Sequence, residues 1–104
     1  MDKYLKLLTA TLLVIPLVVS AAVPEWITGK ITRIYADPSD IVYVIGPANS
    51  GPCGSNFFHI PRANENFKEF YSLVLTAFTV DKSVSVYVSS CSGARNITSH
   101  GSIQ

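Results

Sequence analysis

The side chains best suited to chemistry in this sequence are two cysteines and two histidines. Cys53 lies in the loop segment SGPCGS, and Cys91 lies in SSCSG. Such thiols can act as nucleophiles, as metal ligands or as the halves of a disulfide. A nucleophile needs a base held beside it, and no sequence pattern assigns His59 or His100 that role. The histidines also lack zinc-finger spacing, so we predict no catalytic residue, no metal site and no cofactor.

The N-terminal segment, residues 1–22, has the pattern of a secretory signal peptide. Two lysines precede an apolar run over residues 7–19, and small residues follow at 20–22. The apolar run is about 13 residues long, whereas a helix that spans a bilayer needs roughly 20. We therefore expect cleavage after Ala22, a secreted or periplasmic mature chain of residues 23–104, and no membrane span after the signal is removed.

The predicted export of the chain indicates what the two thiols do, because it places them in an oxidising compartment. Oxidising compartments favour disulfides, and two cysteines allow only one intramolecular pairing. We predict a disulfide between Cys53 and Cys91, which closes a loop of about 38 residues and contributes at most roughly 4 kcal/mol in the chain-entropy model. A domain of roughly 80 residues has a small core, so this contribution is a large share of its stability.

The charges of the mature chain balance. Its lysines and arginines equal its aspartates and glutamates in number. Nucleic-acid binding requires clustered cations that neutralise phosphates, and no such cluster is visible. A near-zero net charge also gives no polybasic attraction to anionic lipids. We therefore expect neither nucleic acid nor a membrane surface as a partner.

Three strands are predicted in the first half of the mature chain. β-Branched residues fill WITGKITRIYAD (26–37), which ends in the turn DPSD. Ile31 and Ile34 are three positions apart, so a β-bulge between them is needed to turn both toward the core. DIVYVIG (40–46) is a continuous apolar run typical of a strand covered on both faces. NFFHIP (56–61) follows a loop rich in glycine and proline.

The hydrophobic period then changes to that of a helix, predicted over about residues 65–79. Asn66 and Glu69 resemble a capping box at its start. Leu73 and Ala77 widen the apolar arc beyond the single face that a surface helix needs. Either a small sheet wraps this helix deeply, or part of the arc meets another subunit. Leu73 and Ala77 are therefore candidate oligomer-interface residues.

The last clear strand is SVSVYVSS (83–90), in which valines alternate with serine and tyrosine. Cys91 ends this strand. The tail that follows is predicted either to add a weak edge strand around Ile97 or to fray. The order strand–strand–strand–helix–strand, with a bulged first strand, favours a mainly β α+β domain: a small OB-like barrel. A plain sandwich, with a curved antiparallel sheet packed on the helix, is the alternative.

The segment NFKEFYSLVLTAFTVDKSVSVYVSSCS resembles the helix-and-strand region of the binding (B) subunits of the subtilase cytotoxin and typhoid toxin class. EW at the mature start and the early strands GKITRIY and DIVYVI fit that class more loosely. Short exported proteins of Gram-negative bacteria share the same layout. The resemblance implies an OB fold, a homo-oligomer such as a ring of five, a cell-surface glycan as ligand and an A subunit as partner.

The chain also departs from those toxin subunits. It is shorter, it has fewer cysteines, and it lacks their extra stretch before the final cysteine. The region before the first strand, which supplies their glycan-contacting hydroxyls, is shortened to EWITG. No sugar-contacting residue is therefore carried over, because a fold alone defines no site.

Three tyrosines are the candidate ligand-binding residues. Tyr87 lies opposite the valine face of its strand, and Tyr35 and Tyr43 lie on neighbouring predicted strands. Exposed tyrosines on a sheet can stack on a sugar or a peptide, although such rings are also often partly buried for structural reasons.

The remaining polar candidates have ordinary interpretations. His59, on an aromatic strand, is expected to be structural, and His100, in a polar tail, is expected to be solvated. Asn96 begins the sequon NIT, which matters only in a eukaryotic secretory route. No G-x-S-x-G turn supports a serine hydrolase. The sequence thus favours a binding module for a glycan or protein ligand, with a non-catalytic exported structural or interaction protein as the alternative.

Overall fold

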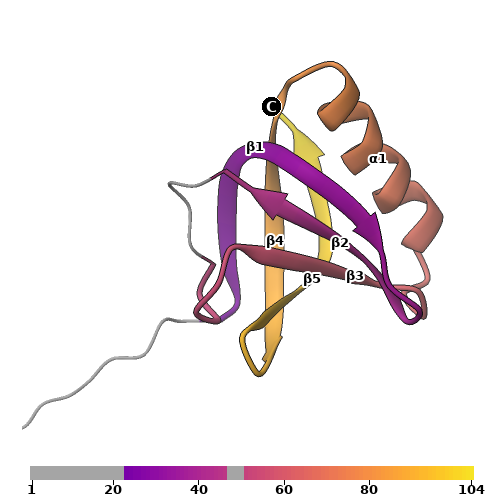
Figure 1. Ribbon diagram of the computed structural model, residues 1–104. Coiled ribbons are helices and arrows are strands. Elements are labelled where there is room, and N and C mark those ends of the chain that lie inside the picture. The colour runs from indigo at the N-terminus through magenta and orange to yellow at the C-terminus, as the bar shows by residue number, and fades with distance from the viewer. Residues whose placement is uncertain (1–22, 47–50) are drawn as a thin grey trace, which may run out of the picture.

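The computed structural model describes residues 23–46 and 51–104 (Figure 1). Its elements, in chain order, are β1 (Glu25–Ala36), β2 (Asp40–Ile45), β3 (Phe57–Pro61), α1 (Phe67–Thr79), β4 (Ser83–Ser92) and β5 (Arg95–Ile103). The predicted signal peptide lies outside the described residues, so its cleavage stays a prediction. In the described part of the chain, no helix is both long enough and apolar enough to cross a membrane.

The five strands close into a barrel in the order β1-β2-β3-β5-β4. All neighbouring strands pair antiparallel except β3 and β5, which are parallel. A small five-stranded barrel of this kind, with one helix inserted between β3 and β4, has the architecture of the OB fold. The predicted OB-like, mainly β fold is therefore confirmed, and the sandwich alternative is wrong.

Strand β1 is long enough to pair with two neighbours because it bends at a bulge. Its first half pairs with β4 and its second half with β2. The register with β2 shifts between Ile31 and Arg33, where the sequence predicted a β-bulge. Ile31 is buried, and Ile34 packs at the edge of the same core. The bulge thus restores the inward direction that strict alternation would have lost.

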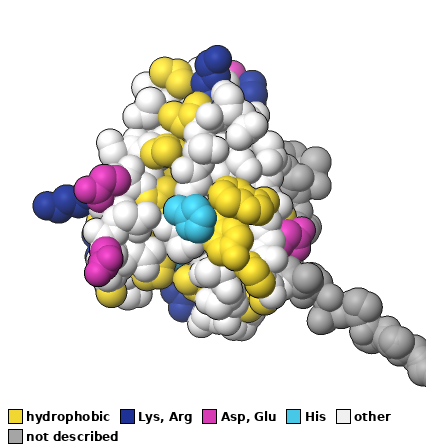
Figure 2. All heavy atoms as spheres, turned by 180° about the vertical axis from the view of Figure 1, so that it is seen from behind, with side chains coloured by type: hydrophobic (Ala, Val, Ile, Leu, Met, Phe, Trp, Pro, Cys, Tyr) yellow, Lys and Arg dark blue, Asp and Glu magenta, His cyan; other side chains and the backbone are white. Residues whose placement is uncertain are grey.

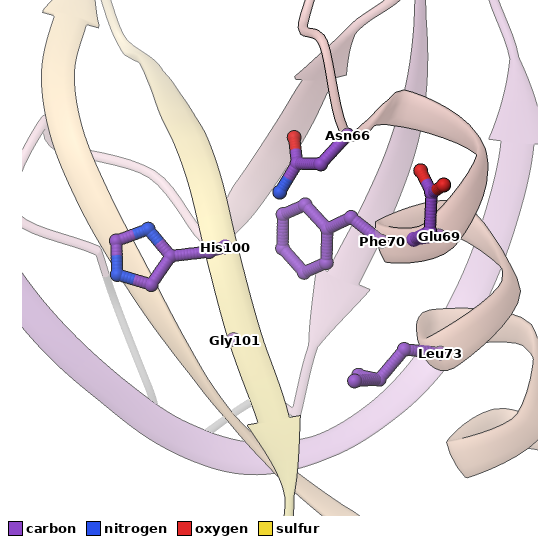
Figure 3. A pocket seen from close by; sticks show the side chains of 6 residues that line it. All are labelled: Asn66, Glu69, Phe70, Leu73, His100 and Gly101. Carbon is purple, nitrogen blue, oxygen red and sulfur yellow. The ribbon is translucent and has the colours of Figure 1, made fainter.

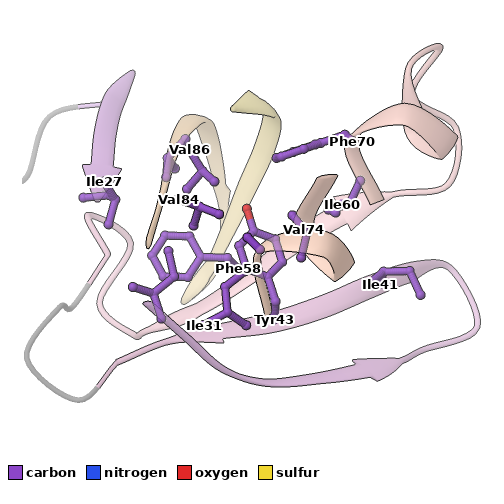
Figure 4. Close-up of a cluster of buried hydrophobic side chains, with 13 residues drawn as sticks. Ile27, Ile31, Ile41, Tyr43, Phe58, Ile60, Phe70, Val74, Val84 and Val86 are labelled. Atoms are coloured by element: carbon purple, nitrogen blue, oxygen red, sulfur yellow. The ribbon is translucent and has the colours of Figure 1, made fainter. Parts of the chain in front are cut away.

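The barrel interior is filled by side chains from the strands and from α1 (Figure 4). Every residue of β2 is buried, as its continuous apolar run predicted. In β4 the three valines point inward, as their alternation predicted. The rings of Tyr43 and Phe58 stack at the centre with their centroids 5.7 Å apart. Each fully buried aliphatic or phenyl side chain contributes roughly 1.5–3 kcal/mol to folding.

Helix α1 lies along one side of the barrel and adds Phe70, Val74 and Ala77 to this core. Ala77 is completely buried within its own chain, so its predicted place in an oligomer interface is wrong. The small barrel covers that side of the helix. This was one of the two explanations that the sequence offered for the wide apolar arc of the helix. Leu73 is half-buried and packs against the core from its margin.

The start of α1 differs from the predicted capping box. Asn66 makes no side-chain cap bond to the helix, and the helix begins at Phe67. The Asn66 Nδ2 group instead donates to the Ser99 carbonyl at 2.9 Å. This side chain therefore ties the helix start to β5 rather than completing a local motif.

The C-terminal tail is a full strand of nine residues, not a weak edge or a frayed end. It pairs with β4 over most of its length and with β3 near its start, which closes the barrel. Its inward-facing residues Asn96 and Thr98 are polar and completely buried. A strand whose inward positions are polar shows no apolar alternation, which explains why the sequence pattern was weak.

The loop before β3 is held by a disulfide and by one buried amide. Cys53 and Cys91 are bonded, as predicted, with their Cα atoms 5.5 Å apart. The Asn96 Oδ1 atom accepts from the Cys53 N–H at 2.9 Å, and Asn96 Nδ2 donates to the Phe57 carbonyl at 2.8 Å. Because these bonds occupy the buried amide, Asn96 has a structural role in the folded protein and cannot carry a glycan there.

Candidate functional site

Three aromatic side chains lie next to one another on the outer face of the barrel. Trp26 of β1 is directly opposite Tyr87 of β4, and Tyr87 is directly opposite His100 of β5. Successive side chains of a strand point to opposite faces. Since Ile27 and Val86 point into the core, their neighbours Trp26 and Tyr87 face outward. We call Trp26, Tyr87 and His100 the aromatic row.

The rings of the aromatic row are in mutual contact. His100 stacks on Tyr87 with centroids 4.7 Å apart and planes 28° apart. The Trp26 ring lies 5.2 Å from Tyr87 and 5.3 Å from His100, tilted against the first and edge-on to the second. His100 is exposed, as expected, and it also packs against two rings. Each such aromatic pair contributes about 0.5–1.5 kcal/mol beyond its buried area.

The aromatic row remains open to solvent. Trp26 is 52% exposed, which is high for so large an apolar side chain. On this face of the molecule, Figure 2 shows a histidine beside bulky hydrophobic side chains, with acidic side chains nearby. Contiguous exposed apolar patches commonly mark interaction sites. The row sits on three paired strands of a closed barrel, so its rings are held in place before any ligand arrives.

A hollow of about 120 Å³ adjoins the row at His100 (Figure 3). It lies between α1 and β5 and is lined by Asn66, Glu69, Phe70, Leu73, His100 and Gly101. Phe70 and Leu73 give it an apolar floor, while Asn66 and Glu69 supply polar groups from the start of the helix. His100 contributes to both the row and the lining of the hollow, so the two adjoin at this residue, and its ring projects from β5 away from Phe70 and Leu73 (Figure 3).

Gly101 keeps β5 close to β4 beside this hollow. A Cβ atom at Gly101 would lie 2.6 Å from the Ser85 carbonyl oxygen, closer than real contacts allow. Any side chain there would push the two strands apart.

Two polar groups of the hollow, the Asn66 amide oxygen and the Glu69 carboxylate, are available to accept hydrogen bonds. Asn66 uses its amide N–H on Ser99, and the Ser99 hydroxyl lies 2.9 Å from His100 Nδ1. Among the described residues, no partner contacts the Glu69 carboxylate by a hydrogen bond or an ion pair. The site thus combines an aromatic surface with a carboxylate and an amide oxygen, which can accept hydrogen bonds from a ligand.

The three candidate tyrosines lie in three different places. Tyr87 belongs to the aromatic row. Tyr35 is 38% exposed, but it lies in a separate group with Phe57, and the Arg33 guanidinium is 5.2 Å from its ring centroid. Tyr43 is completely buried, so its candidacy as a surface ligand-binding residue is wrong. Strand β2 is covered on both faces, and its sequence therefore did not show which residues point into the barrel.

Sequence reasoning missed Trp26 and the contact role of His100. Neither was predicted as a site residue, because the pairing of β4 with β1 and β5 does not follow from the hydrophobic pattern of any one strand. The sequence feature that could have led to the aromatic row was the alternation in β4, which turns Tyr87 outward. The register across the two neighbouring strands then supplies Trp26 and His100.

A second polar cluster lies on another part of the barrel. Asp37, Asp40 and His59 are close enough to act together as metal ligands. However, His59 Nδ1 lies 2.8 Å from Asp40 Oδ2, and Arg95 Nη2 donates to the same oxygen at 2.9 Å. The guanidinium already balances the buried carboxylate, so we interpret this group as an ion-pair network that joins β2, β3 and β5. Within it, His59 has a structural contact.

Comparison with known proteins adds no identification, since no family model, curated protein or solved structure matches the chain. The protein is therefore defined by its own structure, as a small OB-like barrel with an aromatic row and an adjoining hollow.

Proposed function

We propose that this protein is an exported, non-catalytic binding module that holds a cell-surface glycan on the aromatic row and in the adjoining hollow. The observation that carries the proposal is the row itself: three rings in contact, with Trp26 52% exposed. Saccharide rings present apolar C–H faces that pack on aromatic rings. Their hydroxyls at the same time need hydrogen-bond partners, so a binding site combines both kinds of group.

The hollow supplies the hydrogen-bond partners that the sugar hydroxyls need. The Glu69 carboxylate and the Asn66 amide oxygen can accept hydrogen bonds from hydroxyl groups of a sugar stacked on the row. The indole N–H of Trp26 and the phenol of Tyr87 add polar atoms at the edges of the rings. The OB-like fold and the resemblance to glycan-binding toxin subunits support the same conclusion, as does a disulfide typical of exported proteins.

We also propose that several copies assemble, as the resemblance to ring-forming B subunits implies. A shallow site binds one sugar weakly, and a ring of sites multiplies that affinity through multivalency. After folding, apolar residues left exposed on α1 include Leu75 and Phe78, 39% and 42% exposed, with Val80 beyond the helix end at 54%. A second copy of this chain is the proposed occupant of that surface, and an A subunit is a further proposed partner of the ring.

The competing proposal is an exported interaction protein that binds another protein and no sugar. The exposed apolar surface of Leu75, Phe78 and Val80 favours it, because such residues also occur in protein interfaces. The two proposals differ in which surface matters. The first requires the aromatic row, and the second requires only the helix surface.

A glycan array separates these proposals. We expect the purified mature protein to bind a defined set of glycans and the Trp26→Ala variant to lose at least about tenfold in affinity, which is about 1.4 kcal/mol. Tyr35→Ala is the matched control, because it removes an exposed aromatic ring that lies outside the row. Equal binding by the wild type and Trp26→Ala, or no glycan bound by the wild type, would contradict the proposed function.

A further inference from the structure

We infer that the hollow beside the aromatic row selects neutral or amino saccharides and discriminates against anionic ones; this inference rests on the proposed function and specifies its ligand class. Among the described residues, Glu69 is the one acidic side chain that lines the hollow, and no lysine or arginine lines it. A sugar seated there would place its substituents beside an unpaired carboxylate. An anionic group in that position would be repelled, whereas a hydroxyl or an ammonium group would be attracted.

The neighbouring cations do not offset this carboxylate. Arg62 precedes α1, but its Nη2 donates to the Asp37 carbonyl at 3.0 Å, and its guanidinium lies 5.6 Å from the Phe67 ring centroid. Lys68 adjoins Glu69 in sequence but does not line the hollow. An arginine or a lysine that meets an anionic group directly makes a strong charge-assisted hydrogen bond to it. The described lining of this hollow supplies neither.

The start of a helix can itself attract an anion, so its position beside the hollow bears on the ligand class. Here Glu69 occupies the first turn of α1 and supplies the negative charge that the helix dipole favours. A second anion in the hollow would meet this carboxylate before it gained from the dipole. The helix start therefore does not create an anion site at this place.

The hydrogen-bonding groups of the hollow point to a ligand rich in donors. The Asn66 amide N–H is already bonded to Ser99, which leaves its carbonyl oxygen available. The Glu69 carboxylate only accepts hydrogen bonds. Sugar hydroxyls can donate to both groups, and a sugar ammonium would add an ion pair to Glu69. A carboxylate or sulfate group can only accept, so it would leave both oxygens unpaired.

The test is an array that carries neutral, amino and anionic saccharides, probed at physiological salt with the wild type, Glu69→Gln and Trp26→Ala. We expect the wild type to bind neutral and amino saccharides several-fold more tightly than the anionic forms of the same sugars, because the exposed Glu69 carboxylate is partly screened by salt. Glu69→Gln should weaken amino saccharides several-fold and strengthen anionic ones. Glu65→Gln is the matched control: it removes the same charge from a residue outside the hollow and should leave the ratios unchanged.

The two proposals fail in different ways. If the wild type binds no saccharide, or if binding does not depend on Trp26, the proposed function is wrong. If binding depends on Trp26 but anionic saccharides bind as tightly as neutral ones, the inference about Glu69 is wrong and the proposed function stands. The same holds if Glu69→Gln and Glu65→Gln have equal effects.

Discussion

Tyr43 carries a hydroxyl into the centre of the barrel, where β5 supplies its partner. The Tyr43 hydroxyl donates to Thr98 Oγ1 at 3.0 Å, and Thr98 Oγ1 donates to the His59 carbonyl at 2.8 Å. Complete burial raises the pKa of Tyr43 well above its ordinary value, because a phenolate would lose its hydration there; the bond to Thr98 offsets this only in part. One side chain thus couples the core to the alkaline stability of the protein.

Replacing Tyr43 by phenylalanine tests this coupling. We expect Tyr43→Phe to lower the free energy of unfolding by about 1 kcal/mol at neutral pH, because one buried hydrogen bond is lost. Above pH of about 10 the unfolded wild-type chain releases the tyrosine proton while the folded chain keeps it, so wild-type stability falls as pH rises. The variant lacks this loss, so the difference between the two proteins should shrink progressively as pH rises above about 10, the ordinary pKa of tyrosine.

Urea unfolding at a series of pH values measures this difference. Tyr35→Phe is the control, because Tyr35 is exposed and its hydroxyl is not part of the core. A stability gap between the wild type and Tyr43→Phe that stays constant over the alkaline range would contradict the account of the buried hydroxyl.

For single residues, the sequence predicted which side chains could bind a ligand better than it predicted whether they are buried or exposed. Alternation in β4 correctly predicted that Tyr87 lies opposite the valine face. It gave no direction for Tyr43, because both faces of β2 are covered. The aromatic row could not be assembled either, since Trp26 and His100 meet only through two strand pairings that join distant parts of the chain.

At the scale of the elements, the loop before β3 is held in place by a disulfide and by hydrogen bonds to one buried side chain. The disulfide joins Cys53 to the end of β4, and the buried Asn96 of β5 bonds to the loop backbone at Cys53 and Ser55. These links attach one loop to two strands. The loop therefore depends on β4 and β5 being paired.

Removing the disulfide should weaken the whole barrel. We expect Cys53→Ser and Cys91→Ser each to lower stability by a few kcal/mol, with the chain-entropy value of roughly 4 kcal/mol as the upper bound. Asn96 should keep the loop folded in native conditions. Urea unfolding with and without reductant measures the loss, and a digest analysed without reductant should show the two cysteines linked. Complete iodoacetamide labelling of both thiols in the native, unreduced protein would contradict this account.

The elements that the sequence predicted well are those with a clear hydrophobic period. The bulge in β1, the buried run of β2 and the helix all followed from spacing. Strand β5 did not, because its inward residues Asn96 and Thr98 are polar and Gly101 interrupts its pattern. The start of α1 was also misjudged, since Asn66 bonds to Ser99 in another element rather than to its own helix.

At the scale of the whole molecule, the closed barrel buries part of the apolar surface of α1 and leaves another part exposed to solvent. Ala77 lies in the core, and Leu73 packs at its margin. Leu75, Phe78 and Val80 remain exposed. The proposed self-association therefore uses different residues from those that the sequence indicated.

We expect Phe78→Lys to dissociate the assembly while the monomer stays folded, because a charge placed in an apolar interface must be desolvated without a partner. Leu73→Lys, by contrast, should reduce stability, because Leu73 packs against the core. Sedimentation of both variants, with circular dichroism to follow folding, separates the two effects. A wild-type protein that sediments as a monomer at tens of micromolar would contradict the proposed assembly.

The central claim is that a saccharide stacks on the aromatic row, and the chain carries its own reporter of that event. Trp26 is the only tryptophan in the sequence, and it lies in the row. We expect titration of the mature protein with a glycan selected on the array to change the tryptophan emission in a saturable way. The midpoint should equal the dissociation constant measured by calorimetry. Calorimetric binding of that glycan with no change in the Trp26 emission would place the ligand elsewhere and contradict the account.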